Sequence, residues 1–325
     1  MGVFLLTVVL SFGPAFGYAA ILYWLDRFEK EPRRMLIGSF LWGAFIATFG
    51  AIVWSSIFEA SLLAITGDEM LVEVSGATVV APLVEESLKG AAVLIIFLAF
   101  RHEFDSILDG IVYAGITALG FAATENVLYL FFSGYSEDGM GGLIALFILR
   151  VIMGGWGHAV YTSFIGIGLA MARLSRNRLV QFGAPVLGWC VAVGLHALHN
   201  GMATFLASQG LGGLGATLLV DWTSWLFALG IIVWAIRREH TWMAQHLQDE
   251  VAQGVISQAQ YNKVCSMRGQ IQAQLSGVQG RRFYQLCAEL AQKKHQFSIH
   301  GDEHGNTARI AALRNDLSRL ASQVA

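Results

Sequence analysis

One stretch decides the fold: ATVVAPLVEESLKGAAVLIIFLAF, residues 77–100. It is apolar over the roughly 20 residues that a helix needs to cross a bilayer, yet its first half carries Glu85, Glu86 and Lys89. A charged side chain at mid-bilayer costs about 2.5–3.5 kcal/mol, so charges that persist there usually mark function. The stretch therefore predicts a membrane span that contributes to a polar site.

The composition of the whole chain agrees with a membrane protein. Of 325 residues, 55% are hydrophobic and 14% are charged, and the mean hydropathy is +0.56. Soluble domains carry about 25% charged residues, so this composition excludes an ordinary soluble enzyme and a disordered chain. The cysteines at 190, 265 and 287 have neither disulfide nor zinc-finger spacing, which excludes a disulfide-stapled secreted domain.

Six further stretches have the length and hydropathy of membrane spans. The sequence predicts an all-α, polytopic membrane helix bundle of about seven transmembrane helices, at 3–25, 35–58, 78–100, 107–132, 143–170, 180–207 and 213–236. Lys and Arg occur in alternate loops, which predicts an outer N-terminus and a cytoplasmic C-terminus. Arg150 and the motif GGWG (154–157) interrupt the fifth span, so we expect a kink or re-entrant bend there.

The composition changes near residue 237. We therefore expect two domains, a transmembrane domain at 1–236 and a cytoplasmic helical tail at 237–325. The tail has 11 basic and 7 acidic residues and helix-like apolar spacing, which predicts short helices with a polar hinge near HGDEHGN (300–306).

Polar residues recur at similar depth in four of the predicted spans. With the orientation given by the loops, this depth lies in the outer half of the bilayer and predicts one water-accessible pocket there. The catalytic candidates are Glu85, Glu86, Glu125, His158, His196 and Asn200, with Lys89, Asn126, Arg150 and His199 in support.

Each of these residues also has a purely structural interpretation. Glu85 and Lys89 are four residues apart and would form a neutralising pair on one helix face. Glu125 and Asn126 would bind neighbouring helices through hydrogen bonds. Arg150 would be a structural counter-ion, and His199 would only flank the important pair. The coincidence of the whole set at one depth favours a functional site.

This set of residues is suited to hydrolysis. A buried glutamate can take a proton from water, and a histidine can share that water or protonate a leaving amine. His196 and Asn200 share a helix face and could stabilise an oxyanion. Alternatively Glu85, His158 and His196 could bind Zn²⁺ with water as fourth ligand. Neither HExxH nor GxSxG occurs.

The ordered motifs resemble one known family. They are DRFEKEP (26–32), EESLK (85–89), FAATEN (121–126), Arg150 with His158, and HALHN (196–200). In this order they resemble the PrsW-type intramembrane proteases, which belong to the wider group of the CAAX prenyl endopeptidases. The resemblance covers about residues 20–205 and leaves the tail out.

The resemblance implies cleavage of a peptide bond in or near the membrane. It places the paired glutamates of the family at Glu85 and Glu86, the third at Glu125, and the histidines at His158 and His196. In the related prenyl endopeptidases, the first glutamate and a histidine are thought to activate water, and the HxxxN element, here His196 and Asn200, to form the oxyanion hole. The family motifs do not decide whether a metal, for example Zn²⁺, takes part.

The sequence thus predicts an intramembrane endopeptidase in a bacterial inner membrane, with its site toward the extracytoplasmic half. Its partners would be the lipid bilayer and a membrane-anchored protein substrate, for example an anti-sigma factor, but no nucleic acid. The alternatives are a proton-coupled transporter or channel, a catalytically silent scaffold acting through its tail, and a prenyl-protein endopeptidase of the same fold. Oligomeric state, substrate identity and the role of the tail stay open.

Overall fold

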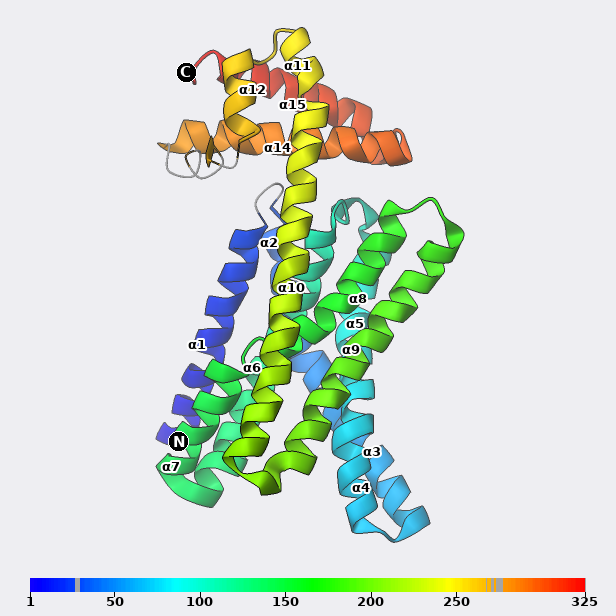
Figure 1. The fold of residues 1–325 in the computed structure, drawn as a ribbon, viewed down its shortest axis with the longest axis vertical. Helices are drawn as coiled ribbons and strands as arrows, with labels where there is room; N and C mark the ends of the chain where they lie inside the picture. Colours follow the sequence, from blue (N-terminus) through cyan, green and yellow to red (C-terminus); the bar gives the residue numbers. More distant parts are fainter. Residues whose placement is uncertain (27–29, 267, 270–271, 273–276, 325) are drawn as a thin grey trace. The chain divides into compact units, whose positions relative to one another are not determined.

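The computed structural model describes residues 1–26, 30–266, 268–269, 272 and 277–324. Within these ranges the chain is helical throughout its regular structure and contains no strand (Figure 1). The predicted all-α class is confirmed. Arg27, one of the basic residues of the first predicted loop, lies outside the described residues.

The chain divides into two compact units, residues 1–25 with 31–230, and residues 26–30 with 231–325. The helices of the first unit are α1 Gly2–Leu25, α2 Arg33–Leu41, η1 Trp42–Ala47, α3 Thr48–Thr66, α4 Glu69–Ser75, η2 Gly76–Val80, α5 Ala81–Ala99, η3 Arg101–Glu103, α6 Ile107–Leu128, η4 Tyr129–Tyr135, α7 Ser136–Leu146, η5 Phe147–Met153, α8 Gly157–Leu174, α9 Arg178–Leu206 and η6 Ala207–Gln209. Helix α10 (Leu211–His246) begins in the first unit and ends in the second.

Five helical runs among the described residues are long and apolar enough to cross a membrane: Gly2–Leu25, Arg33–Thr66, Ile107–Leu174, Arg178–Leu206 and Leu211–Ala252. The run Ile107–Leu174 contains both the fourth and the fifth predicted spans. The run through α4, η2 and α5 is absent from the five, because Glu85, Glu86 and Lys89 lie in it. A bundle of membrane helices is confirmed, whereas seven crossings and their orientation stay predictions.

Helix α6 is the centre of the first unit, and every residue from Ile107 to Ala123 is buried. It begins with a capping box, in which Asp109 accepts from the backbone N–H of Ser106 at 2.6 Å. A Cβ on Gly110 would lie 2.3 Å from the carbonyl oxygen of Gly166 in α8. Only glycine permits so close an approach of two membrane helices, and this contact packs the start of α6 against α8.

The helical run is interrupted at residues 154–156, within the GGWG motif where the sequence predicted a bend. A Cβ on Gly155 would lie 2.2 Å from the carbonyl oxygen of Val151. That oxygen accepts a hydrogen bond from the Tyr18 hydroxyl at 2.9 Å, so a backbone group released by the break is satisfied. The interruption lets α8 begin at Gly157, which places His158 in its first turn.

The second unit has its own core. It contains the end of α10 with α11 Gln248–Ala252, α12 Gln258–Val264, α14 Gly277–His300, η7 Glu303–Gly305 and α15 Asn306–Ala321. The predicted turn near 300–306 separates α14 from α15, but α14 has 24 residues and is longer than the short helices expected. Because α10 is continuous through residue 237, the proposed domain boundary at 236/237 stays a prediction.

Candidate active site

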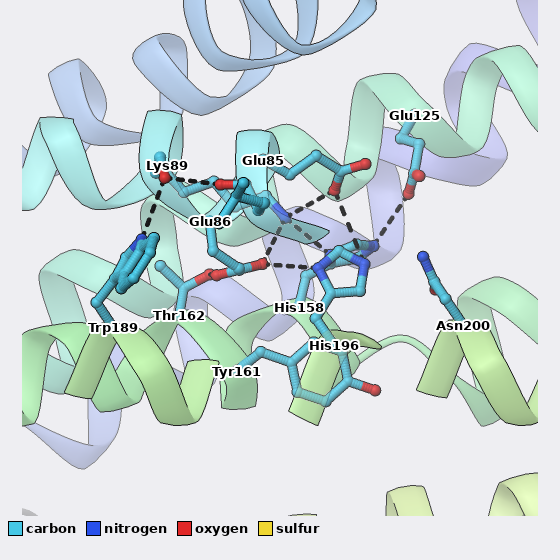
Figure 2. A network of polar contacts seen from close by, with 12 residues as sticks. Glu85, Glu86, Lys89, Glu125, His158, Tyr161, Thr162, Trp189, His196 and Asn200 are labelled. Carbon is cyan, nitrogen blue, oxygen red and sulfur yellow. Dashed lines mark hydrogen bonds and ion pairs between the residues drawn. The ribbon is translucent and has the colours of Figure 1, made fainter. Parts of the chain in front are cut away.

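Six predicted residues meet in one place within the first unit (Figure 2). They come from four helices and are joined by hydrogen bonds and ion pairs. We call them the buried cluster: Glu85, Glu86 and Lys89 of α5, Glu125 of α6, His158 of α8 and His196 of α9.

Lys89 lies at the centre of the buried cluster. Its ammonium Nζ donates to Oε2 of Glu85 at 3.1 Å, to Oε1 of Glu86 at 2.9 Å, and to Nδ1 of His158 at 3.0 Å. The residue is 0% exposed. Its Nζ also lies 3.9 Å from the centroid of the Phe121 ring, a cation–π contact. The interaction with Glu85, predicted from the sequence spacing, therefore extends to a second carboxylate and an imidazole.

Hydrogen bonds define the tautomers of the two histidines. Nδ1 of His196 lies 3.0 Å from Oε1 of Glu86, and an ionised carboxylate only accepts, so Nδ1 carries the proton and Nε2 the lone pair. Nε2 of His158 lies 3.0 Å from Oε2 of Glu125, so His158 donates from Nε2 while its Nδ1 accepts from Lys89. The two ring centroids are 4.9 Å apart and nearly perpendicular. Each imidazole thus donates to its carboxylate partner; the other nitrogen of His158 accepts from Lys89, and Nε2 of His196 keeps its lone pair.

The three carboxylates differ in how many donors they receive. Glu86 accepts from Lys89, His196 and the Thr162 hydroxyl, the last at 2.7 Å. Glu125 accepts from His158 and, at 2.8 Å, from Arg150. Within the described part of the chain, Glu85 accepts only from Lys89. Glu85 is therefore the carboxylate with spare capacity to hold a water molecule.

Arg150 acts through Glu125, as its structural interpretation predicted. Its Nε donates to Oδ1 of Asn126 at 3.1 Å, and its guanidinium lies 3.7 Å from the centroid of the Tyr129 ring. Arg150 therefore fixes Glu125 and Asn126 together at the end of α6, and Glu125 in turn fixes His158.

The donor set of the buried cluster fits a metal ion. Glu85, His158 and His196 each offer one ligand atom, and these atoms all lie within 4.8 Å of one another. Both histidines donate their other nitrogen to a carboxylate, which is the outer-shell arrangement typical of metal-binding histidines. Lys89 now contacts Nδ1 of His158 and Oε2 of Glu85, so a cation ligated by these atoms would displace those contacts of the ammonium.

Four of the ten predicted residues lie outside the buried cluster; Arg150 and Asn126 are connected to it through Glu125, whereas Asn200 and His199 have other partners. The amide Nδ2 of Asn200 donates to the carbonyl oxygen of Ala77 at 2.8 Å, and Figure 2 shows this side chain apart from the network. His196 uses its N–H for Glu86. The geometry therefore gives no support to His196 and Asn200 as a joint oxyanion pair. His199 bonds Asp221 of α10 instead, with Nδ1 2.9 Å from both carboxylate oxygens.

Sequence reasoning did not single out Thr162 or Tyr161, and it interpreted Asp221 as an interfacial or helix-pairing residue. Thr162 and Tyr161 are four and three residues after His158, so helical spacing already placed them on its face. Tyr161 stacks on the His196 ring at 5.4 Å and donates to Oδ1 of Asp221 at 3.1 Å. Asp221 was the one charge predicted in the last span, and this isolation was the available signal.

A cavity of about 620 Å³ lies beside the buried cluster. His158, Tyr161, His199 and Asp221 are among its polar lining residues, together with Asn126 and Arg150. The remaining wall includes many small residues, among them Gly142, Gly154, Gly155, Gly210 and Gly213. A cavity of this size with converging polar groups is the usual form of a substrate site.

A family model described as "PrsW family intramembrane metalloprotease" matches residues 31–236. The chain belongs to the PrsW family. It is therefore a membrane protein with the fold and peptidase character of that family.

Individual PrsW proteases match over different lengths. Protease PrsW of Bacillus subtilis is 25% identical over 228 residues, which are 70% of this chain and 90% of that protein. Protease PrsW of Geobacillus kaustophilus is 30% identical over 170 residues, 51% and 68% of the two chains. Protease PrsW of Clostridioides difficile is 38% identical over 113 residues, 34% of this chain but only 45% of that protein. No solved structure matches the chain at comparable significance.

Proposed function

We propose that this chain hydrolyses a peptide bond of a membrane-anchored protein, with water activated between Glu85, His158 and His196. The observation that carries the proposal is the convergence of one ligand atom from each of these three residues within 4.8 Å. Membership of the PrsW family supports peptide hydrolysis as the reaction. The side chains supply a base and two lone pairs at one point, as hydrolysis by water requires.

In the metal-free form of this proposal, Glu85 takes the proton from the attacking water, because it has the fewest donors of the three carboxylates. Glu86 and Glu125 do not contact the substrate but hold His196 and His158 in their tautomers. Lys89 pairs with both Glu85 and Glu86 and offsets one of their two negative charges. His158 also lines the cavity and therefore faces the bound peptide.

The residues that would hold a metal are Glu85, His158 and His196. Two histidines and one glutamate form a ligand set of catalytic zinc, which leaves a fourth position for water. When bound there, Zn²⁺ would lower the pKa of its water to about 7 and polarise the scissile carbonyl. The chain itself contributes the orientation of both imidazoles and the counter-charge of Lys89.

We further propose that the substrate enters from the extracytoplasmic half of a bacterial inner membrane, as the loop charges predicted. An anti-sigma factor with one membrane anchor is an example of such a substrate. The small residues of the cavity wall suit an extended peptide, whose backbone needs close approach.

The experiment has two stages. Fragments of membrane proteins are compared in cells that carry wild-type protein or Glu85→Ala, and a substrate found in this way is reconstituted with the purified protease in proteoliposomes. We expect Glu85→Ala, His158→Ala and His196→Ala each to abolish cleavage while the protein stays folded. Cleavage by all three variants at the wild-type rate would refute the proposal. Flux of protons across the vesicles without proteolysis would favour the transporter instead.

A further inference from the structure

Asp221 is a buried carboxylate outside the buried cluster. Its side chain is 4% exposed, and it lies on α10 in the last predicted span. Within the described part of the chain its bonded groups are the Tyr161 hydroxyl and the His199 imidazole. A carboxylate at this depth needs a compensating charge, and of these two partners only His199 can carry one.

Hydrogen bonds to Asp221 fix the orientation of the His199 imidazole. Its Nδ1 lies 2.9 Å from both oxygens of Asp221, so this nitrogen donates. Nε2 has no partner among the described residues. The imidazole lines the cavity with 30% of its side chain exposed. Asp221 therefore holds the ring so that Nε2 is the nitrogen left for a ligand in the cavity.

Tyr161 connects this pair to the buried cluster. Its ring centroid is 5.4 Å from that of His196 and 6.1 Å from that of His199. Its hydroxyl shares Asp221 with His199. His158 and His199 line the same cavity. A peptide that reaches the buried cluster through the cavity therefore passes His199.

We propose that His199 is a further catalytic residue, which donates a hydrogen bond from Nε2 to the carbonyl oxygen of the scissile peptide as that oxygen gains negative charge. Asp221 is the positioning residue that holds it. With both nitrogens donating, the ring is an imidazolium, and the Asp221 carboxylate balances its charge. This inference rests on the proposed function. It gives His199 the role that the sequence predicted for Asn200, whose amide is bound to Ala77.

The test uses the full-length protease and its substrate in proteoliposomes. Removing one donor to an oxyanion lowers kcat by about 10²–10³-fold, and we expect this loss in His199→Ala with KM changed by less than about twofold. Asp221→Asn should show a smaller loss of kcat, about tenfold or more, because the ring stays but its orientation and charge are no longer supported. His199→Gln, which keeps a donor, should recover part of the rate.

The control is Thr223→Val, an exposed position on α10 whose hydroxyl bonds only the carbonyl of Leu219. It should cleave at the wild-type rate. Substrate binding is measured separately in the inactive Glu85→Gln background, where adding His199→Ala should leave the affinity unchanged. A wild-type kcat in His199→Ala, or a loss confined to KM, would overturn the inference. If wild type and Thr223→Val were themselves inactive, the proposed function would fail instead.

Discussion

Two buried glutamates, Glu86 in the first unit and Glu250 in the second, are each 0% exposed and accept from a lysine. Glu250 receives only permanent cations: Arg314 donates to both of its oxygens at 2.7 Å, and Lys294 donates at 2.9 Å. Glu86 receives Lys89, but also the neutral donors His196 and Thr162. We call Glu250, Lys294 and Arg314 the tail cluster. Its ion pairs connect three helices.

The difference shows how a structural charge cluster is told from a catalytic one. In the tail cluster Arg314 and Lys294 both donate to Glu250, Lys294 also donates to Asp249 and to the carbonyl of His246, and the three residues tie α11, α14 and α15 together. In the buried cluster Glu85 accepts a single hydrogen bond among the described residues, Nε2 of His196 keeps a lone pair beside it, and His158 reaches a cavity. Spare acceptors next to a cavity can bind water or a metal, whereas saturated ones cannot.

The largest expected effect is a difference in cleavage rate between a variant of the buried cluster and a variant of the tail cluster. Glu85→Gln keeps the size of the side chain but removes its basicity, so the cleavage rate should fall about 10³-fold or more. Glu250→Gln in the tail should leave the rate per folded molecule within about twofold. Both are measured by cleavage of the reconstituted substrate in proteoliposomes, normalised to folded protein. Equal losses of cleavage rate in Glu85→Gln and Glu250→Gln would contradict a catalytic role specific to the buried cluster.

Metal removal tests whether cleavage at the buried cluster depends on a bound metal ion. If Glu85, His158 and His196 hold Zn²⁺, dialysis against a chelator should lower the cleavage rate at least about 100-fold. Adding Zn²⁺ should restore it. Activity that resists exhaustive chelation would instead assign proton abstraction to Glu85 without a metal.

The tail cluster should dominate stability where the buried cluster dominates turnover. Removing one partner of a buried ion pair costs about 3–5 kcal/mol, and the partly exposed Arg314 places Glu250→Gln at the lower end, about 3 kcal/mol. Hydrogen exchange of α14 in the full-length protein measures this loss. Arg319→Gln, which breaks an exposed pair with Asp316, is the matched control and should change exchange by less than about 1 kcal/mol. Equal protection in Glu250→Gln and this control would contradict the account.

Thr162 tests whether the support of Glu86 matters to catalysis. Thr162→Val has nearly the same shape but removes the 2.7 Å hydrogen bond to Oε2 of Glu86. A hydrogen bond to a charged group contributes about 1.5–3 kcal/mol, and we expect roughly a tenfold loss of cleavage rate through His196. Ser163→Ala, which removes a hydroxyl bonded only to the carbonyl of Ala159, should lose much less. Wild-type activity in Thr162→Val would show that Glu86 needs no such support.

The smallest effect is the pH dependence of the tail, since Glu250 lies beyond the apolar stretch 213–236. Burial raises the pKa of this carboxyl, but hydrogen bonds from Arg314 and Lys294 outweigh burial and hold the pKa below its ordinary value of 4.5. A lowered folded-state pKa stabilises the fold above pH 4.5, and this contribution is lost as the pH falls through the folded value. Unfolding of the tail should therefore become easier below about pH 4.5 in wild type. Glu250→Gln should show a flatter pH dependence, and equal slopes would contradict the assignment.

Sequence reasoning predicted the helical class and most of the site because both depend on local rules. Apolar length marks membrane helices, and a charge inside such a helix has few explanations besides function. Glu85, Glu86, Lys89, Glu125, His158 and His196 were found in this way and lie together. The bend at GGWG followed from its glycines.

What the sequence could not predict depends on how side chains pair across helices. Helical spacing placed His196 and Asn200 on one face, but only the fold shows that Asn200 is bound to the backbone of Ala77. Asp221 follows HALHN by more than twenty residues, and its pairing with His199 depends on how α10 packs on α9. The same limit applies to α10, whose helix continues through the composition change at 237.

The measurement that tests the central claim most directly is the metal content of the purified, active protease and of its variants. The account predicts about one Zn²⁺ per chain in wild type and in His199→Ala, and loss of the metal in Glu85→Gln, His158→Ala and His196→Ala. Fully active wild-type protein without metal, or an undiminished metal content in all three variants, would contradict it.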